Sequence, residues 1–386
     1  MVDFSLPAGT ERFRAELRAW LATSLTDDVL AAARRGPADP DAFETIRTWN
    51  RELADAGWAA ISWPRAYGGR GATVLEQLVY IEETVRARAP MPLNVIGLNN
   101  IAPALMQYGN EEQKRALLPR MMRADDIWCQ GMSEPEAGSD LASLRTRAVR
   151  DGDHFVVTGQ KTWTSLGHRA DWCQLYVRSD PEAPKHRGIS CLVVDMHLPG
   201  IDARPLPTLT GETHFAEVFF DDVRVPADAL LGPLHGGWQV ATTTLSHERA
   251  NAARLYAELQ VRLEEVTADL LRAEEDGASV ANDPVTLHRL GELAVRAAFL
   301  EGLCKRSISA GLHGGDPFAS ASLAKTVWGE LGQDIAALAY DALGPDAAGG
   351  RWADARLAAR SLTIAGGTTQ INKNITAQRV LGLPRR

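Results

Sequence analysis

The sequence has few cysteines and no long hydrophobic segment. Its 386 residues contain 4 cysteines, which are too scattered for a disulfide framework, and none lies in a C-x-x-C pair. The longest nearly uninterrupted apolar run covers only residues 189–196, whereas a membrane-spanning helix needs about 20 apolar residues. The first residues also lack the basic start and apolar core of a signal peptide. We therefore expect no membrane span and a location in the reducing cytoplasm.

An excess of positive charge is missing too. The 41 lysines and arginines are outnumbered by 49 aspartates and glutamates, and the formal net charge at pH 7 is −8. This balance argues against a nucleic-acid-binding protein. Hydrophobic residues make up 45% of the chain and charged residues 23%, as in ordinary globular proteins. At about 100–200 residues per domain, the length predicts two or three domains, and composition allows an enzyme, a scaffold or a binding protein.

The motifs of several common chemistries are absent. There is no G-x-x-x-x-G-K-[ST], no G-x-G-x-x-G and no G-x-S-x-G. The sequence therefore lacks the motifs that are typical of nucleotide hydrolysis and of serine esterases. The 9 histidines include no H-E-x-x-H. We therefore expect no metal site.

Hydrophobic spacing predicts a helical first part. Apolar residues recur at helical spacing over 10–25 and 41–56, and two more helices are expected near 75–87 and 94–108. Pro64 and three nearby glycines interrupt the pattern and predict a loop. These helices form the predicted N-terminal domain, residues 1–126.

Short strands are expected to follow. The turn dipeptide Asp151-Gly152 lies between residues 145–150 and the β-branched run 155–157, which predicts a hairpin. Further strands are predicted at 172–178, 189–195 and 217–225. Because no helix-length pattern separates them, the sheet of this middle domain, residues 127–236, should be largely antiparallel.

The helical period returns at Gly237. Long helices are predicted over 245–270, 285–312 and 318–343, followed by shorter pieces. The predicted fold class is therefore an α+β multidomain protein, with a helical domain, an antiparallel β domain and a four-helix-bundle-like C-terminal domain, residues 237–386.

Four segments carry candidate functional residues. Residues 130–140 (QGMSEPEAGSD) form either a loop that binds an anion or a ring, or a plain connector. In 158–165 (TGQKTWTS), Trp163 either stacks on a flat ring or packs in the β core. In 245–249 (LSHER), Glu248 borders the apolar stripe as a buried base or as half of an ion pair. The fourth segment is AGGTTQI, near the C-terminus.

Together, and in this order, the four segments resemble the acyl-CoA dehydrogenase family. The most specific motif is the run M-S-E-P-x-A-G-S-D. It is supported by four others: K-x-W-T-S, A-D-W, G-G-T-T-Q-I and R-V-L-G-L-P. The resemblance covers essentially the whole chain. The resemblance implies FAD-dependent α,β-dehydrogenation of an acyl-CoA thioester to a trans-2-enoyl-CoA, with flavin N5 as the hydride acceptor. Alternatives within the same fold are an acyl-CoA oxidase, a flavin monooxygenase or a non-catalytic subunit of a heteromeric enzyme.

The resemblance also implies site residues. Those expected to bind FAD are Gln130, Met132, Ser133, Trp163, Thr164, Ser165, Thr368 and Gln370. Ser139 and Arg249 would contact the CoA portion, where a cation suits the phosphates.

The position of the catalytic base departs from the commonest pattern. Most members of the family have a Glu directly before the G-T of the C-terminal motif, and Gly366 stands there in this chain. In a minority, including isovaleryl- and long-chain-type enzymes, the base lies on the long helix immediately before an Arg, which corresponds to Glu248. The resemblance therefore assigns Glu248 as the base, and Gly366 is expected to offer its backbone N–H to the thioester carbonyl.

A second departure concerns the assembly. The Arg and Gln residues by which the family reaches the FAD of a neighbouring subunit have no counterparts around 276–284 and 341–345. Either other residues replace them, or a different subunit of the same fold completes the site. The expected partners are an acyl-CoA substrate, an electron-transfer flavoprotein or similar acceptor, and further subunits in a homo- or heterotetramer or a dimer.

Overall fold

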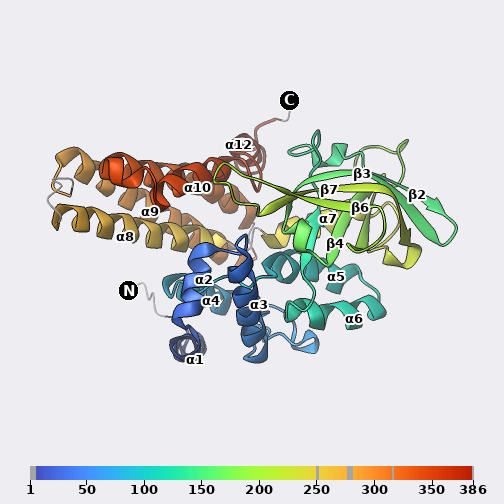
Figure 1. Cartoon of the computed structure of the whole chain (residues 1–386), viewed down its shortest axis with the longest axis horizontal. Helices are drawn as coiled ribbons and strands as arrows, with labels where there is room; N and C mark the ends of the chain where they lie inside the picture. Colours follow the sequence, from blue (N-terminus) through green and yellow to red (C-terminus); the bar gives the residue numbers. More distant parts are fainter. Residues whose placement is uncertain (1–5, 249–251, 276–280, 315–316, 385–386) are drawn as a thin grey trace. The chain divides into compact units, whose positions relative to one another are not determined.

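The computed structural model describes residues 6–248, 252–275, 281–314 and 317–384, and the chain divides into two compact units (Figure 1). The helical unit comprises Met1–Leu21, Val74–Ala87 and Arg249–Arg386, and the mixed unit comprises Ala22–Thr73 and Arg88–Glu248. Along the chain, helices are followed by strands and then by helices, which confirms the predicted fold class. The grouping follows packing rather than chain order, so the boundaries predicted at 126 and 236 stay predictions.

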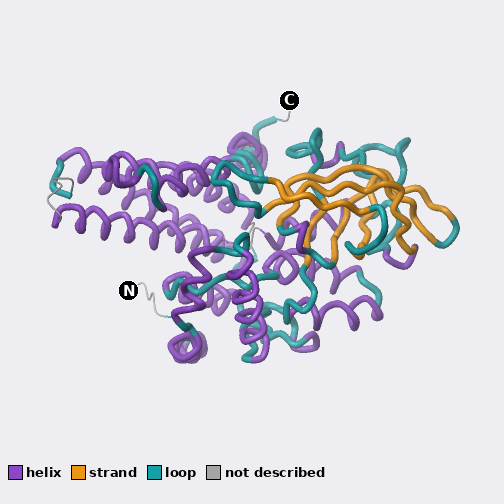
Figure 2. Tube along the Cα trace, in the orientation of Figure 1, coloured by secondary structure: helices purple, strands orange, loops and turns teal. Residues whose placement is uncertain are grey.

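The mixed unit contains a seven-stranded sheet (Figure 2). Its strands are β1 (Trp128–Gly131), β2 (Arg147–Asp151), β3 (His154–Ser165), β4 (Trp172–Arg178), β5 (Ile189–Asp195), β6 (Ile201–Leu206) and β7 (Phe215–Pro226). The order is β1-β4-β2-β3-β7-β6, and β5 also pairs with β4. Pairing is largely antiparallel as predicted, but β1 and β2 both run parallel to β4. Strands β1 and β6 were not predicted.

The helices of the mixed unit are α2 (Asp27–Arg35), α3 (Pro40–Asp55), α5 (Ala102–Tyr108), α6 (Glu111–Met122) and α7 (Gly237–Glu248). Three of them, α2, α3 and α6, begin at short polar side chains that cap them. Asp39 accepts from the amide of Ala42 and Pro40 follows it, which starts α3. The helix predicted over 94–108 is an α-helix only from Ala102, because a π-helical turn, Gly97–Ile101, precedes it.

The helical unit is built around three long helices, α8 (Ala252–Glu275), α9 (Pro284–Leu312) and α10 (Pro317–Leu343), which pack on one another (Figure 1). Most of α1 (Ala8–Ser24), α4 (Val74–Arg86), α11 (Arg351–Ala358) and α12 (Thr369–Ile375) complete it. Leu259, Val266, Leu300, Leu331 and Leu338 are among its core residues. The helix predicted over 245–270 corresponds to the end of α7 and to α8, and residues 249–251 lie outside the described part. Among the described residues, no helix is both long and apolar enough to cross a membrane.

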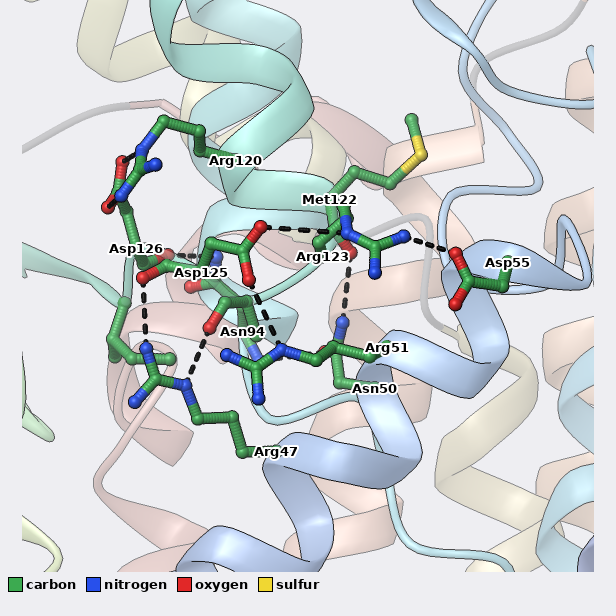
Figure 3. Close-up of polar contacts among 12 residues, drawn as sticks. Arg47, Asn50, Arg51, Asp55, Asn94, Arg120, Met122, Arg123, Asp125 and Asp126 are labelled. Carbon is green, nitrogen blue, oxygen red and sulfur yellow. Dashed lines mark hydrogen bonds and ion pairs between the residues drawn. The ribbon is translucent and has the colours of Figure 1, made fainter.

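A polar network fixes the chain where α6 passes into β1 (Figure 3). The side chain of Asn94, only 1% exposed, donates to the carbonyls of Met121 (2.8 Å) and Asp126 (3.0 Å) and accepts from the amide of Trp128 (3.0 Å). Arg47 of α3 donates to two further carbonyls of this connection. The start of β1 is thereby held in place by side chains that are distant in sequence.

Replacement of Asn94 by Ala should destabilise the protein strongly. It removes the partner of the Asp126 carbonyl and of the Trp128 amide, whereas the Met121 carbonyl still accepts from the amide of Ala124. Each buried group left unpaired costs about 1–3 kcal/mol, so a loss of at least about 2 kcal/mol is expected. Guanidinium denaturation followed by circular dichroism measures it. Asn99→Ala is the matched control, because Asn99 makes no side-chain hydrogen bond to a described residue. If Asn94→Ala loses no more stability than Asn99→Ala, the role assigned to Asn94 is contradicted.

Candidate functional site

Two of the predicted segments lie together in the mixed unit. The loop that follows β1 crosses the end of β3, where the amide of Thr162 donates to the carbonyl of Ser133 (2.9 Å). The ammonium group of Lys161 donates to the carbonyl of Met132 (3.2 Å). The structure thus brings Met132 and Ser133, both half-buried, next to the strand that carries Trp163.

A buried ion pair joins these two segments. Lys161 is fully buried, and its Nζ lies 2.8 Å from Oε1 of Glu134, which is 8% exposed. The carboxylate of Glu134 also accepts from the backbone amides of Arg145 (2.6 Å) and Thr146 (2.8 Å). A buried charge is tolerated only when it is paired and hydrogen-bonded, and both conditions are met by this pair. The pair fixes the loop, β3 and the approach to β2 at one point.

The pKa of Glu134 reflects this environment. Burial by itself would raise it, but the charge and hydrogen bond of Lys161, together with the hydrogen bonds from Arg145 and Thr146, hold the pKa of the carboxyl group below its ordinary value. Glu134 is therefore ionised at neutral pH. Its stabilising effect is present above the ordinary carboxyl pKa and is lost as the pH falls through the lower value of the folded protein.

Trp163 sits on a β-bulge with its ring exposed. In the pairing of β3 with β7, Lys161 faces Val218 and Thr164 faces Ala216, so two residues of β3 share the space of one residue of β7. Trp163 has a φ of +56° and is 57% exposed. Exposed aromatic surface and left-handed backbone both cost free energy in an isolated protein. Such a residue is suited to bind a flat ring.

The neighbours of Trp163 alternate in direction. Thr164 is fully buried, and its hydroxyl has no hydrogen-bond partner among the described residues. Ser165 is half-buried. Of these two residues, Ser165 is the more exposed.

Ser139 lies beside a cationic segment. It is exposed, and the adjacent Asp140 pairs with Lys185 at 2.6 Å. His186 and Arg187 follow, and both are exposed. Arg178, which the sequence did not single out, anchors this region by donating to three backbone carbonyls.

The C-terminal candidates lie on one turn of the helical unit. Gly366 and Gly367 both have positive φ, 65° and 86°, which explains why glycines stand there. Thr368 caps α12 by accepting from the amide of Ile371 (3.1 Å), and Gln370 is exposed. The turn presents its backbone and the Gln370 side chain to solvent.

The remaining predicted residues are described only in part. α7 ends at Glu248, whose side chain is not described, and Arg249 lies outside the described residues. The four cysteines are buried and free. Within the described ranges, no group of three or more His, Cys, Asp and Glu residues could hold a metal ion.

Family models match three consecutive stretches of the chain. They are the acyl-CoA dehydrogenase N-terminal domain over residues 8–125, the middle domain over 129–223 and the C-terminal domain over 235–381. Acyl-CoA dehydrogenase IpdE1 of Mycobacterium tuberculosis is 38% identical over 390 residues, which cover 97% of this chain and 98% of that protein.

Solved structures agree with these matches. The Tcur3481-Tcur3483 steroid ACAD superposes with a TM-score of 0.88 at 32% identity, and the ChsE4-ChsE5 complex from Mycobacterium tuberculosis with a TM-score of 0.85 at 34% identity. Each comparison covers 100% of both chains.

Removal of the buried ammonium group should destabilise the protein far more than removal of an exposed one. Lys161→Met leaves the Glu134 carboxylate buried without its counter-ion, which costs about 3–5 kcal/mol. Lys185→Met breaks a pair in which both side chains are 60% exposed, and should cost at most about 1 kcal/mol. Urea denaturation followed by tryptophan fluorescence compares the two variants. Equal losses would show that the Lys161–Glu134 pair does not fasten the loop to β3.

Proposed function

Because this chain belongs to the acyl-CoA dehydrogenase family, we propose that it catalyses the α,β-dehydrogenation of an acyl-CoA thioester to a trans-2-enoyl-CoA with bound FAD. The observation that carries the proposal is Trp163, an exposed ring on a strained bulge, fastened through Lys161 to the loop at Met132. An arrangement of this kind suits a flat, ring-shaped cofactor.

The described residues fit such a cofactor. Trp163 offers the flat face, Met132 and Ser133 are half-buried on the adjacent loop, and Ser165, two residues further along β3, is half-buried as well. Since the hydroxyl of Thr164 is enclosed, we infer that this residue contributes through its backbone. Gln130, Thr368 and Gln370 complete the proposed set. When bound, FAD supplies the acceptor for the hydride that leaves Cβ.

The CoA portion is assigned to Ser139 and Arg249. Lys185, which pairs with Asp140 beside Ser139, and Arg187 are both exposed, so this segment carries two cationic side chains although the chain as a whole is acidic. Phosphate groups bind well to such clusters, because charge-assisted hydrogen bonds are the strong ones.

The chemical step needs one base and one set of donors. We assign Glu248 as the base that takes the α proton, while the electron pair of the Cα–H bond forms the new double bond and the β hydrogen departs as hydride. The backbone N–H of Gly366 would donate to the thioester oxygen, on which negative charge develops as the proton leaves. A glycine suffices there, because a backbone donor and no side chain is required.

Replacement of Glu248 by Gln should stop flavin reduction but leave FAD bound. Loss of a positioned base lowers the rate by about 10²–10⁴-fold. Anaerobic stopped-flow measurement of flavin absorbance, after mixing with straight-chain, branched and steroid-derived acyl-CoA esters, gives the rate. Steroid-derived esters belong in the panel because one structural neighbour is a steroid ACAD.

Glu258→Gln is the control for this experiment. Glu258 pairs with Arg254 at 2.8 Å on α8, so its loss removes a carboxylate without touching the proposed base. It should reduce flavin as fast as the unaltered protein. A Glu248→Gln protein that does the same would rule out Glu248 as the base.

We also propose that a second, different subunit completes the FAD site. The residues by which the family bridges subunits have no counterparts around 276–284 and 341–345 in this sequence, and one structural neighbour is a complex of two named chains. Electron-transfer flavoprotein remains the predicted electron acceptor.

The subunit proposal is tested by the ratio of flavin to protein. The chain purified alone should hold well under one FAD per chain. Co-expression with a second acyl-CoA dehydrogenase-like chain should raise the ratio and yield a mixed assembly by native mass spectrometry. A homo-oligomer with one FAD in every chain would overturn this proposal and leave the proposed reaction untouched.

A further inference from the structure

A chain of hydrogen-bonded polar side chains runs through the mixed unit from β1 to α7. Nε2 of Gln130 donates to Oε1 of Gln174 (3.2 Å), and Nε2 of Gln174 donates to Oγ1 of Thr244 (3.3 Å). The hydroxyl of Tyr176 lies 3.2 Å from the same Oγ1. Gln174 and Tyr176 are fully buried, and Thr244 is 1% exposed. We call this set the polar chain.

The polar chain lies where an apolar strand would be expected. β4 is buried along its length, and Cys173, Leu175 and Val177 belong to the core of the sheet. Residues two apart in a strand face the same side, so Gln174 and Tyr176 present polar groups together on the opposite side. Burial of an amide without a partner is costly, because the hydrogen bonds that it makes with water are lost. These groups are therefore accommodated only with Thr244 in its observed place.

The chemistry of the polar chain favours one fixed arrangement. Burial raises the pKa of Tyr176 well above its ordinary value, so the phenol stays protonated and neutral. Apolar packing alone would let a helix shift slightly along a sheet, whereas directional hydrogen bonds that must all be satisfied select one register.

The two ends of the polar chain meet the two halves of the proposed site. Gln130 is followed by Gly131 and the loop that begins at Met132. Thr244 precedes Glu248 by four residues, about one turn of α7. Near the same turn, the hydroxyl of Thr243 lies 3.2 Å from that of Tyr108 on α5.

We propose that Gln174 and Thr244 are positioning residues, which hold the last turn of α7 at a fixed place relative to the strand that leads into the flavin-binding loop. This inference rests on the proposed function, because Glu248 is the group that is positioned. In this proposal both residues act through Glu248 and not by contact with the reacting atoms. Their effect is on the geometry of proton removal.

Three consecutive threonines on α7 provide a matched experiment. The hydroxyl of the buried Thr244 bonds to β4, whereas that of the exposed Thr242 donates back to the carbonyl of Gln239 in its own helix (2.8 Å). Val has nearly the shape of Thr and lacks the hydroxyl group. Thr244→Val and Thr242→Val therefore remove the same atoms from the same helix, but only the first removes the bond to β4.

The Thr244→Val variant should bind FAD and acyl-CoA normally but reduce the flavin slowly. Because misplacement of reacting groups by about 1 Å costs on the order of 10²-fold, we expect the rate at saturating substrate to fall about 10- to 100-fold, with Kd within about twofold. Thr244→Ser, which keeps the hydroxyl group, should restore most of the rate. Thr242→Val should match the unaltered protein. An unchanged rate in Thr244→Val, or an equal loss in Thr244→Ser, overturns the inference.

A double variant separates positioning from a merely structural effect. If Thr244 acts through Glu248, Thr244→Val should cause no further loss in the Glu248→Gln background, because residues that act as one unit are not additive. If the double variant shows the product of the two separate rate reductions, the inference is contradicted, but Glu248 remains the proposed base. Conversely, rapid reduction by Glu248→Gln alone would overturn the proposed base.

A milder variant covers the case in which Thr244→Val fails to fold. Tyr176→Phe removes one of the two side-chain bonds to Thr244 and leaves that of Gln174 in place. The expected result is a loss of about two- to tenfold in the rate of flavin reduction, with an unchanged Kd, since a neutral hydrogen bond contributes about 1 kcal/mol. A rate equal to that of the unaltered protein counts against the inference.

Discussion

The need to keep one buried charge paired determines the local architecture of the candidate site. Lys161 has no access to water, so its ammonium group requires the Glu134 carboxylate, which in turn takes the amides of Arg145 and Thr146. The cost of removing both charges from water cancels much of their attraction, and the pair therefore adds little net stability. Its contribution is geometric, because the loop, β3 and the approach to β2 have only one arrangement that satisfies it.

The exposed position of Trp163 follows from that arrangement. The bonds of Lys161 and Thr162 to the loop hold this part of β3, while the next residues pair with β7 two against one, so the strand bulges at Trp163. Left-handed backbone at a bulky residue disfavours the free protein, and so does the exposed surface of Trp163, whose ring packs edge-on against Phe215. A ligand that covers the ring recovers part of this cost, which is why local strain of this kind is concentrated at binding sites.

The sequence predicted the features that are specified by neighbouring residues, but not those that depend on residues far apart in the chain. Local patterns located most helices and the hairpin at Asp151-Gly152, but not β1, which has four residues and a parallel partner, nor β6, which contains Pro205 and charged side chains. The motif residues were found because their order resembles a known family. The bulge at Trp163 depends on pairing with β7, and the partners Glu134 and Lys161 stand 27 residues apart without any local sign that this lysine is buried.

The mixed unit uses ionic contacts at the loop and neutral contacts toward α7, and electrostatics gives a reason for the difference. A charge close to a catalytic carboxylate shifts the pKa of that group, because opposite charge favours its ionised form and like charge disfavours it. Amides, hydroxyls and a protonated phenol fix geometry without adding such a charge. Gln174, Tyr176 and Thr244 can therefore orient the end of α7, which carries the proposed base, without placing a charge beside it. Lys161 and Glu134, whose charges neutralise each other, fasten the loop where direct proton transfer is not proposed.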